Sequence, residues 1–255
     1  MTIEFASFNE WNPADYLSNY YAYVEEDEKC TLNFLVQEFK KIRGQPVVLE
    51  FGIGPTIHHL LPLIPYVREI HVADYLESNL EEIRKWQLED SGSHNWKRFT
   101  EKVLIYEGIP VPNLQDINRR ETLVRQRITK YLRCDASLPN PISNNEIEKY
   151  EFILSCYCAD SSTNDQSEWF RFMSNIISLL KPGGFFVTTA LRNCQYYKIG
   201  DKYFPSANVN EEDFENLFRQ NNFDMATTII KFESVSEHIN DGYESIVLAS
   251  GFKLS

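Results

Sequence analysis

Strand-like and helix-like runs alternate along most of this chain, and that alternation limits the folds available to it. The strand-like runs are mostly apolar, which indicates strands buried on both faces. Apolar strands separated by helices predict a mostly parallel sheet with helices on both sides. In order, the expected elements are strand VVLEF, a helix from Thr56, strand EIHVADY, a helix over 78–86, a helix over 116–131 followed by YLRCDA, strand EFILSCY, a helix over 166–180 and strand FFVTTAL.

The two ends of the chain depart from this alternation. Pro13 follows Asn12 in WNPADYLSNYY and predicts a helix start, and a second helix is expected over 29–42. After FFVTTAL come a hairpin candidate YYKIGDKYF, a helix NEEDFENLFRQNN, and strands ATTIIKFESV and YESIVLASGF, whose short polar link makes them antiparallel. We therefore expect one α/β domain over 1–255. A helical lid over 1–44 precedes a Rossmann-like, doubly wound, mostly parallel sheet over 45–255, with an antiparallel strand near the C-terminus.

Composition and charge narrow the class of protein. The 255 residues carry a net charge of −12, which argues against nucleic acid, because a phosphate backbone needs a positive face. No long apolar run or signal peptide is visible, so we expect a cytoplasmic monomer or weak dimer with a small-molecule substrate and no membrane partner. Five irregularly spaced cysteines predict reduced thiols. Cys156-Tyr-Cys158 has no matching Cys/His pair at zinc-ligand spacing, so no metal site is expected.

A glycine loop follows the first strand, in VVLEFGIGPTIHHLL over 47–61. Gly52 and Gly54 let the backbone turn sharply and approach a ligand closely. The third glycine of the dinucleotide fingerprint is absent, which weakens the case for a pyrophosphate cradle. The carboxylate of Glu50, at the end of the strand, would repel phosphate but attract an ammonium group.

Asp74 ends the second strand, 22 residues after Gly52. A carboxylate there accepts hydrogen bonds from the two ribose hydroxyls of an adenosine ligand. Either feature alone also suits a tight turn or a helix cap. Together, and with KPGG downstream, they favour a cofactor site. The site therefore favours an adenosine ligand that lacks pyrophosphate and carries a cationic amino acid group. S-adenosylmethionine (SAM) meets this description, whereas NAD does not.

Segments spread over nearly the whole chain match one family: NPADYLSNYY, EFGIGPTIHHLL, ADYLESNLEEIRKW, YLRCDA, SLLKPGGFFV, YYKIGDKYF and the final KLS. In these segments the chain resembles the nicotinamide, phenylethanolamine and indolethylamine N-methyltransferases, a group of class I SAM-dependent methyltransferases. The motifs are specific for the family and uninformative about the substrate.

The resemblance implies a set of cofactor-binding residues. His58 replaces a tyrosine of the family's cofactor loop and keeps a ring, and Ile53 replaces a small polar residue. Tyr16 and Tyr21, near the N-terminus, also fit an aromatic packing stripe on a helix. The implied positions are Tyr16 and Tyr21 with Gly52, Gly54 and Thr56 at the methionine end, Asp74, Tyr75 and Asn79 at the ribose and adenine, Asp135 and Ala136 at the adenine edge, and Cys156 along the cofactor.

The acceptor side departs from the family. Relatives that bind nicotinamide or aromatic amines carry an acidic residue before the Ala-Leu pair that follows the KPGG strand. Thr189 stands there in this chain and offers only a neutral hydrogen bond, which puts those substrates in doubt. Tyr20, Tyr157 and Ser206 are further acceptor-side candidates, and Tyr157 equally suits a core position. Asp241 precedes Gly242 and is better explained as a turn residue.

Methyl transfer from a sulfonium is an in-line displacement with a neutral leaving group, so alignment matters more than a strong base. Tyr157 is a weak candidate for the base. The primary hypothesis is a SAM-dependent N-methyltransferase acting on a small-molecule amine. One alternative is a SAM-consuming cyclase, in which the α-amine of SAM forms azetidine-2-carboxylate and releases methylthioadenosine. Another is a non-catalytic SAM-binding protein.

Overall fold

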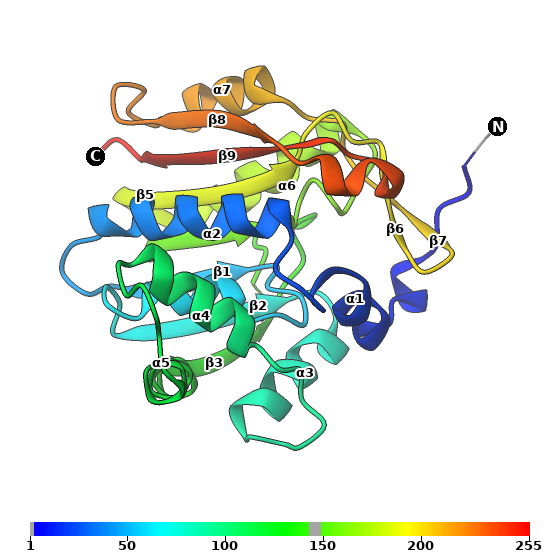
Figure 1. Ribbon diagram of the computed structural model, residues 1–255. Coiled ribbons are helices and arrows are strands. Elements are labelled where there is room, and N and C mark those ends of the chain that lie inside the picture. Colours follow the sequence, from blue (N-terminus) through cyan, green and yellow to red (C-terminus); the bar gives the residue numbers. More distant parts are fainter. Residues whose placement is uncertain (1–2, 143–148) are drawn as a thin grey trace.

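A seven-stranded sheet forms the centre of the computed structural model, which describes residues 3–142 and 149–255 (Figure 1). The strand order is β3-β2-β1-β4-β5-β9-β8. The pairs β1–β2, β1–β4, β2–β3 and β4–β5 are parallel, whereas β9 is antiparallel to both β5 and β8. The predicted α/β, mostly parallel sheet with an antiparallel strand near the C-terminus is confirmed. The strands are β1 (Val47–Phe51), β2 (Glu69–Asp74), β3 (Ile128–Arg133), β4 (Tyr150–Cys156), β5 (Leu180–Leu191), β8 (Ile229–Ser234) and β9 (Ser245–Phe252), and a separate hairpin consists of β6 (Tyr196–Ile199) and β7 (Lys202–Pro205).

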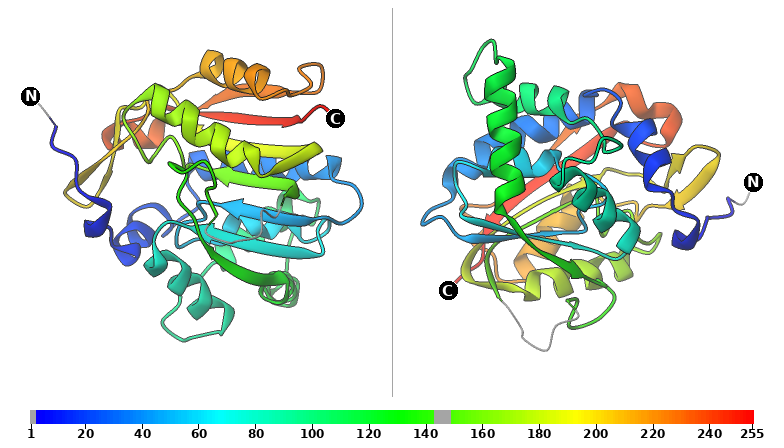
Figure 2. Two further views of the ribbon diagram at one scale, coloured as in Figure 1. Left: turned by 180° about the vertical axis from the view of Figure 1, so that it is seen from behind. Right: turned by 90° about the horizontal axis from the view of Figure 1, so that it is seen from below.

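Helices cover both faces of the sheet. In Figure 1, α2 and α4 lie in front of the strands, and α6 and α7 lie on the opposite face, which turns toward the viewer in the left view of Figure 2. The helices are α1 (Pro13–Tyr20), α2 (Glu26–Glu38), α3 (Glu77–Gln87), α4 (Lys97–Tyr106), α5 (Leu114–Arg127), α6 (Gln166–Ser178) and α7 (Glu211–Gln220), with 3₁₀ segments η1 (Phe8–Glu10), η2 (Phe39–Lys41), η3 (His58–Leu63) and η4 (Ser236–Asp241). Within the described ranges, every helix is too short or too polar to span a bilayer.

Two apolar cores fill the space between these layers. Successive strand residues point to opposite faces, so neighbours in sequence enter different cores. Val48 belongs to the core that includes Leu35 of α2, and Leu49 belongs to the core that includes Ile176 of α6. Both strand residues are fully buried, which explains why the strands read as continuous apolar runs rather than alternating ones.

Three local predictions were wrong or incomplete. The helix expected from Thr56 is the 3₁₀ segment η3, which contains Pro62, a residue without the N–H that a continuing α-helix needs. The helix expected over 116–131 ends at Arg127, and β3 begins at Ile128, where β-branched and aromatic residues favour a strand. Helix α4 was not predicted at all. All five cysteines are free, as expected.

The N-terminal segment divides into two parts. Helix α2 lies along the sheet and packs against β5, β8 and β9, whereas α1 contacts α3 and the β6–β7 hairpin. In Figure 1, α1 and the hairpin lie together at one end of the sheet, beyond the carboxyl ends of β1 and β2. Of the predicted lid, residues 1–44, the described part up to Tyr20 (3–20) therefore lies over the ends of the parallel strands.

Candidate active site

The glycine loop after β1 adopts a backbone that other residues would disfavour. Gly52 has φ +75° and Gly54 has φ +63°, both in the left-handed region. A Cβ atom on Gly52 would lie 2.1 Å from Sγ of Cys158. The amides of Gly52 and Ile53 donate to the carbonyl of Ala73 at 2.8 and 3.1 Å. The loop is thereby held against the end of the neighbouring strand β2.

Asp74 connects this loop to the elements around it. One carboxylate oxygen accepts from the Gly54 amide at 2.8 Å, and the other accepts from the Leu76 amide at 2.8 Å and from Asn79 Nδ2 at 3.0 Å. Asn79 in turn accepts from the indole N–H of Trp11 at 3.0 Å. Burial raises the pKa of Asp74, although these hydrogen bonds to the ionised form oppose the rise. The carboxylate thus fixes the loop, the start of α3 and the N-terminal segment in one arrangement.

A cavity of about 300 Å³ opens beside this loop and Asp74, which places it at the carboxyl ends of the parallel strands. Parallel α/β sheets commonly bind ligands at this edge. Most of the residues that the family resemblance implies for the cofactor lie in its wall. They are Tyr16, Tyr21, Gly52, Gly54, Thr56, Asp74, Tyr75, Asn79, Asp135, Ala136 and Cys156.

Two of the expected cofactor residues, Glu50 and His58, are buried outside the set of described residues that line this cavity. Burial raises the pKa of Glu50 well above its ordinary value, which disfavours the negative charge that was expected of it. His58 stacks on Trp96 with ring centroids 5.2 Å apart. Burial lowers the pKa of His58 to about 4, against the opposing effect of Glu28. The residue that follows it, His59, lines the cavity instead.

A smaller cavity of about 60 Å³ adjoins the first. Its wall includes Tyr20 and Tyr157, two of the predicted acceptor-side residues. The other two, Thr189 and Ser206, are buried and do not belong to the described residues that line either cavity. Thr189 lies on β5, paired with β4 on one side and β9 on the other, which explains its burial. Six residues line both cavities: Trp11, Tyr16, Tyr21, Tyr157, Ser161 and Tyr197.

Tyr157 occupies an unusual backbone position at the boundary of the two cavities. Its φ is +49°, which is rare for a bulky residue and is often found at functional sites. Its hydroxyl lies 2.7 Å from Oγ1 of Thr31 on α2. Burial, with added repulsion from Glu28 and Asp27, raises the pKa of Tyr157 well above its ordinary value. The phenol therefore stays protonated at neutral pH, which argues against its role as a base.

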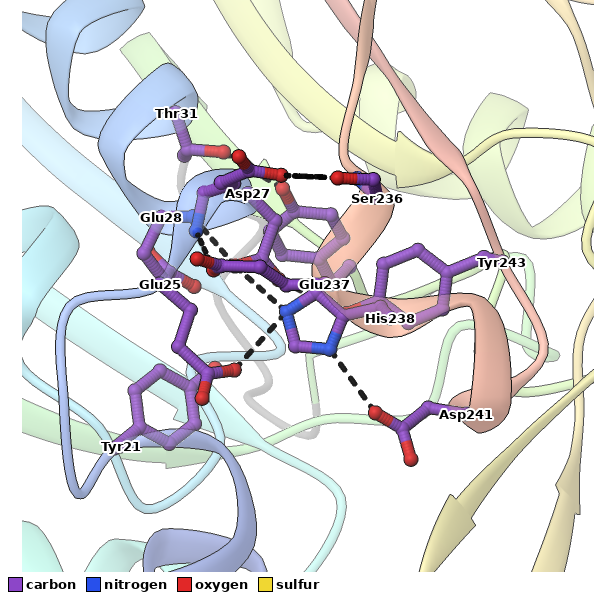
Figure 3. A network of polar contacts seen from close by, with 12 residues as sticks. Tyr21, Glu25, Asp27, Glu28, Thr31, Ser236, Glu237, His238, Asp241 and Tyr243 are labelled. Carbon is purple, nitrogen blue, oxygen red and sulfur yellow. Dashed lines mark hydrogen bonds and ion pairs between the residues drawn. The ribbon is translucent and has the colours of Figure 1, made fainter.

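Acidic residues from α2, from the residue that caps its N-terminus and from η4 surround one histidine beside the smaller cavity (Figure 3). His238 Nε2 lies 3.1 Å from Glu25 and 3.2 Å from Asp27, and Nδ1 lies 3.1 Å from Asp241. Asp27 also accepts from the Tyr243 hydroxyl at 2.9 Å. Burial alone would lower the pKa of His238, but the three carboxylates more than offset it and raise the pKa to about 9. At neutral pH, three carboxylates thus face one imidazolium.

Several cavity residues were not found from the sequence. Trp11 immediately precedes the recognised motif NPADYLSNYY, and His59 lies within EFGIGPTIHHLL, next to the histidine that was chosen instead. Asp27 and Tyr243 come from distant segments that no local pattern marks, whereas Tyr197 lies within the recognised segment YYKIGDKYF. Asp241 was proposed as an acceptor residue or a turn residue. Its carboxylate forms an ion pair with His238, and Asp241 is not among the described residues that line either cavity.

Comparisons with known proteins identify the family of this chain and support its fold. The model of the NNMT/PNMT/TEMT family matches residues 2–251. Human nicotinamide N-methyltransferase is 30% identical, over 94% of this chain and 92% of that protein. Mouse indolethylamine N-methyltransferase is 29% identical, over 92% of this chain and 88% of that protein. In fold, the chain is similar to 1,6-didemethyltoxoflavin-N1-methyltransferase from Burkholderia thailandensis, with a TM-score of 0.53, 14% identity, and coverage of 100% and 94% of the two chains.

Proposed function

The chain belongs to the NNMT/PNMT/TEMT family, and we propose that it transfers the methyl group of SAM to a nitrogen atom of a small aromatic amine. The observation that carries this proposal is the wall of six residues that the two cavities share. A methyl donor in the larger cavity and an acceptor in the smaller one would meet at that wall. Methyl transfer requires this proximity, because the reacting atoms must be about 3–3.5 Å apart and in line.

The larger cavity fits SAM by the chemistry of its wall. An added Cβ at Gly54 would meet only the ring of Tyr16, at 4.0 Å, so the space above the loop is open to a ligand. Asp74 would hold the ribose hydroxyls, and Asp135 would accept from the adenine amine. The rings of Tyr16 and Tyr21 offer a cation–π surface to a sulfonium.

The smaller cavity supports a flat aromatic acceptor. Tyrosine and tryptophan rings make up most of its wall, and several of the hydroxyl groups already have protein partners. Tyr20 donates to the Lys198 carbonyl at 2.5 Å, and Tyr243 donates to Asp27 at 2.9 Å. The wall therefore presents ring faces, which suit an aromatic guest better than a strongly polar one.

Asp27 supplies the negative charge that Thr189 cannot. When bound, SAM provides a methyl group on a sulfonium and leaves as a neutral thioether, so positive charge develops on the acceptor nitrogen. Asp27 lines the smaller cavity, and its network holds more carboxylates than cations. A fixed negative charge beside that nitrogen stabilises the transition state. Alignment can lower the barrier by about 7–11 kcal/mol, so no strong base is required.

The N-terminal segment would have to move for ligands to pass. Trp11, Tyr16 and Tyr21 wall both cavities, and we expect residues 1–44 to act as a lid in part through this segment. Limited proteolysis near 25–29, with and without S-adenosylhomocysteine, tests the lid. Protection by the ligand is expected, and equal cleavage in both states would contradict it.

The remaining parts of the proposal concern the setting of the enzyme. The net charge of −12 and the free cysteines support a cytoplasmic monomer or weak dimer without a nucleic-acid partner. Size-exclusion chromatography coupled to light scattering checks the oligomeric state, and a stable higher oligomer would contradict it.

Mass spectrometry of the sulfur products tests the function directly. The purified chain is mixed with methyl-labelled SAM, alone and with a panel of aromatic and heteroaromatic amines. We expect S-adenosylhomocysteine and a labelled amine, formed only when an acceptor is present. Methylthioadenosine formed without an acceptor would establish the cyclase, which the comparisons do not support. Binding of SAM without any product across the panel would leave the non-catalytic alternative.

A further inference from the structure

Three ionisable side chains meet in the wall between the two cavities. Glu28 comes from α2, and His58 and His59 come from η3. Nε2 of His58 lies 2.9 Å from Oε2 of Glu28, and Nε2 of His59 lies 3.4 Å from the same oxygen. The relative exposures of Glu28, His58 and His59 are 3%, 0% and 6%. The three groups are therefore shielded from water and converge on one point.

Glu28 lies within ion-pair distance of both histidines, but the contacting atoms lack hydrogen-bonding geometry. Among residues 3–142 and 149–255, Glu28 Oε2, His58 Nε2 and His59 Nε2 have no partner with hydrogen-bonding geometry. The rings of Tyr21 and Trp96 pack against His58, with centroids 4.8 and 5.2 Å from its own, and Nδ1 of His58 also has no hydrogen-bond partner among the described residues. Polar atoms buried in this way destabilise a fold unless a partner compensates them. A cation shared by all three would provide that compensation.

We propose that Glu28, His58 and His59 bind one divalent transition-metal ion, of which Zn²⁺ is the representative. The three donor atoms all lie within 4.8 Å of one another. Bonds of about 2.0–2.2 Å in a tetrahedron separate neighbouring ligand atoms by roughly 3.3–3.6 Å. The distance between His59 and Glu28 agrees with this spacing, and that between His58 and Glu28 needs an adjustment of about half an ångström. Two imidazoles and a carboxylate are ligands that Zn²⁺, Co²⁺ and Ni²⁺ accept.

A second group of donors shares His59. Glu50, His59 and Cys156 also lie within 4.8 Å of one another, and Oε2 of Glu50 has no hydrogen-bond partner among the described residues. We assign the ion to the Glu28 group, because Nε2 of both imidazoles lies within 3.4 Å of the same carboxylate oxygen. The two assignments differ in one chemical respect, since only the second includes sulfur.

The location of the site gives it a clear relation to the cavities. Glu28 lines the smaller cavity and His59 lines the larger one, so the ion would occupy the partition between them. Three protein ligands leave one position of a tetrahedron for water or another small ligand, as in catalytic rather than structural zinc sites. The sequence analysis predicted no metal site, because Glu28 and the two histidines lie on separate segments and do not have a zinc-ligand spacing.

Metal content and cobalt spectroscopy on the full chain test the site. The protein is stripped with a chelator, dialysed against Zn²⁺ or Co²⁺, and freed of excess metal. Elemental mass spectrometry should find about one ion per chain. The absorption spectrum of the Co²⁺ form should show the visible bands of four-coordinate Co²⁺ and no thiolate charge-transfer band. We also expect added Zn²⁺ to raise the melting temperature of the stripped protein by several degrees.

Variants assign the ligands. Glu28→Gln and His59→Ala are expected to weaken Zn²⁺ binding at least tenfold and to abolish the shift in melting temperature. His94→Gln is the matched control, because this partly exposed imidazole lies outside the cluster. Cys156→Ser is expected to bind the metal as the unmodified chain does.

Three results would overturn the proposal. One is a metal content near zero in the unmodified chain, with no effect of Zn²⁺ on its melting temperature. Another is a thiolate band with Co²⁺ that Cys156→Ser removes, which would move the site to Glu50, His59 and Cys156. The third is undiminished binding by folded Glu28→Gln. The measurements on the unmodified chain decide the matter even where a variant fails to fold.

Discussion

The two cavities share a wall, yet they are built in different ways. The larger cavity is formed by short contiguous stretches at the carboxyl ends of neighbouring strands, including 51–54, 74–76, 134–137 and 156–158. The smaller cavity collects single residues from distant segments, such as Tyr20 from α1, Asp27 from α2 and Tyr243 from the segment before β9. The geometry of the first depends on local backbone conformation, and that of the second depends on long-range packing.

Because of this difference, substitutions in the two cavities should have different effects. Substitutions in the glycine loop disturb a turn that is bonded to β2, so they should affect the fold and cofactor binding together. Substitutions of single side chains in the smaller cavity leave that turn intact. They should therefore alter turnover or acceptor choice without altering affinity for the cofactor.

The largest effect is expected at Gly52. Gly52→Ala would place Cβ 2.1 Å from Cys158 Sγ, in addition to straining a left-handed backbone. We expect the free energy of unfolding to fall by about 3–5 kcal/mol, with loss of S-adenosylhomocysteine binding. Gly44→Ala is the matched control, because Gly44 has φ +77° and no atom within 4 Å of an added Cβ. It should lose only about 1–2 kcal/mol in urea unfolding. Equal losses for both variants would show that the contact with Cys158 does not restrict the loop.

A pH effect of up to about 3 kcal/mol is expected from His238, beside the smaller cavity. Glu25, Asp27 and Asp241 raise its pKa to about 9 in the fold. Because this folded value exceeds the ordinary value of about 6.5, protonated His238 stabilises the protein fully below about pH 6.5. That contribution is lost as the pH rises through about 9. Urea unfolding at a series of pH values should show the advantage over His238→Asn shrinking across this range. An advantage that stays constant would contradict the raised pKa.

The next effect, at Asp27, tests whether the smaller cavity acts on catalysis alone. Asp27→Asn removes negative charge beside the acceptor nitrogen, and we expect kcat to fall about 10–50-fold, or roughly 1.4–2.3 kcal/mol. Calorimetry with S-adenosylhomocysteine should give an unchanged dissociation constant. Glu26→Gln is the matched control from the same turn of α2, since Glu26 bonds Ser236 and lies outside the described wall of the cavity. A similar loss of kcat in both variants would assign the effect to the packing of α2 against η4.

The same difference explains which parts of the fold and of the candidate site could be predicted from the sequence. The strands followed from apolar runs, and the glycine loop and Asp74 followed from local patterns that the backbone itself requires. Glu50 was misplaced because a strand end does not reveal whether a side chain enters the ligand cavity or the protein interior. Asp27 was missed because its role depends on η4, which is more than 200 positions away along the chain. Local chemistry thus predicted the glycine loop and Asp74, and the family resemblance supplied most other residues of the first cavity, whereas Asp27 of the second needed the tertiary fold.

The smallest effect is expected at Tyr157, where the two cavities meet. Its pKa is raised well above the ordinary value by burial, so the phenol cannot accept a proton at neutral pH. Tyr157→Phe should therefore keep kcat within about threefold, because the ring still forms the wall. The lost hydrogen bond to Thr31, 2.7 Å long, should lower the free energy of unfolding by about 1 kcal/mol. Thr31→Val removes the same bond from the other side and should match that loss. A fall in kcat of about 100-fold or more in Tyr157→Phe, with Thr31→Val fully active, would instead identify Tyr157 as the base.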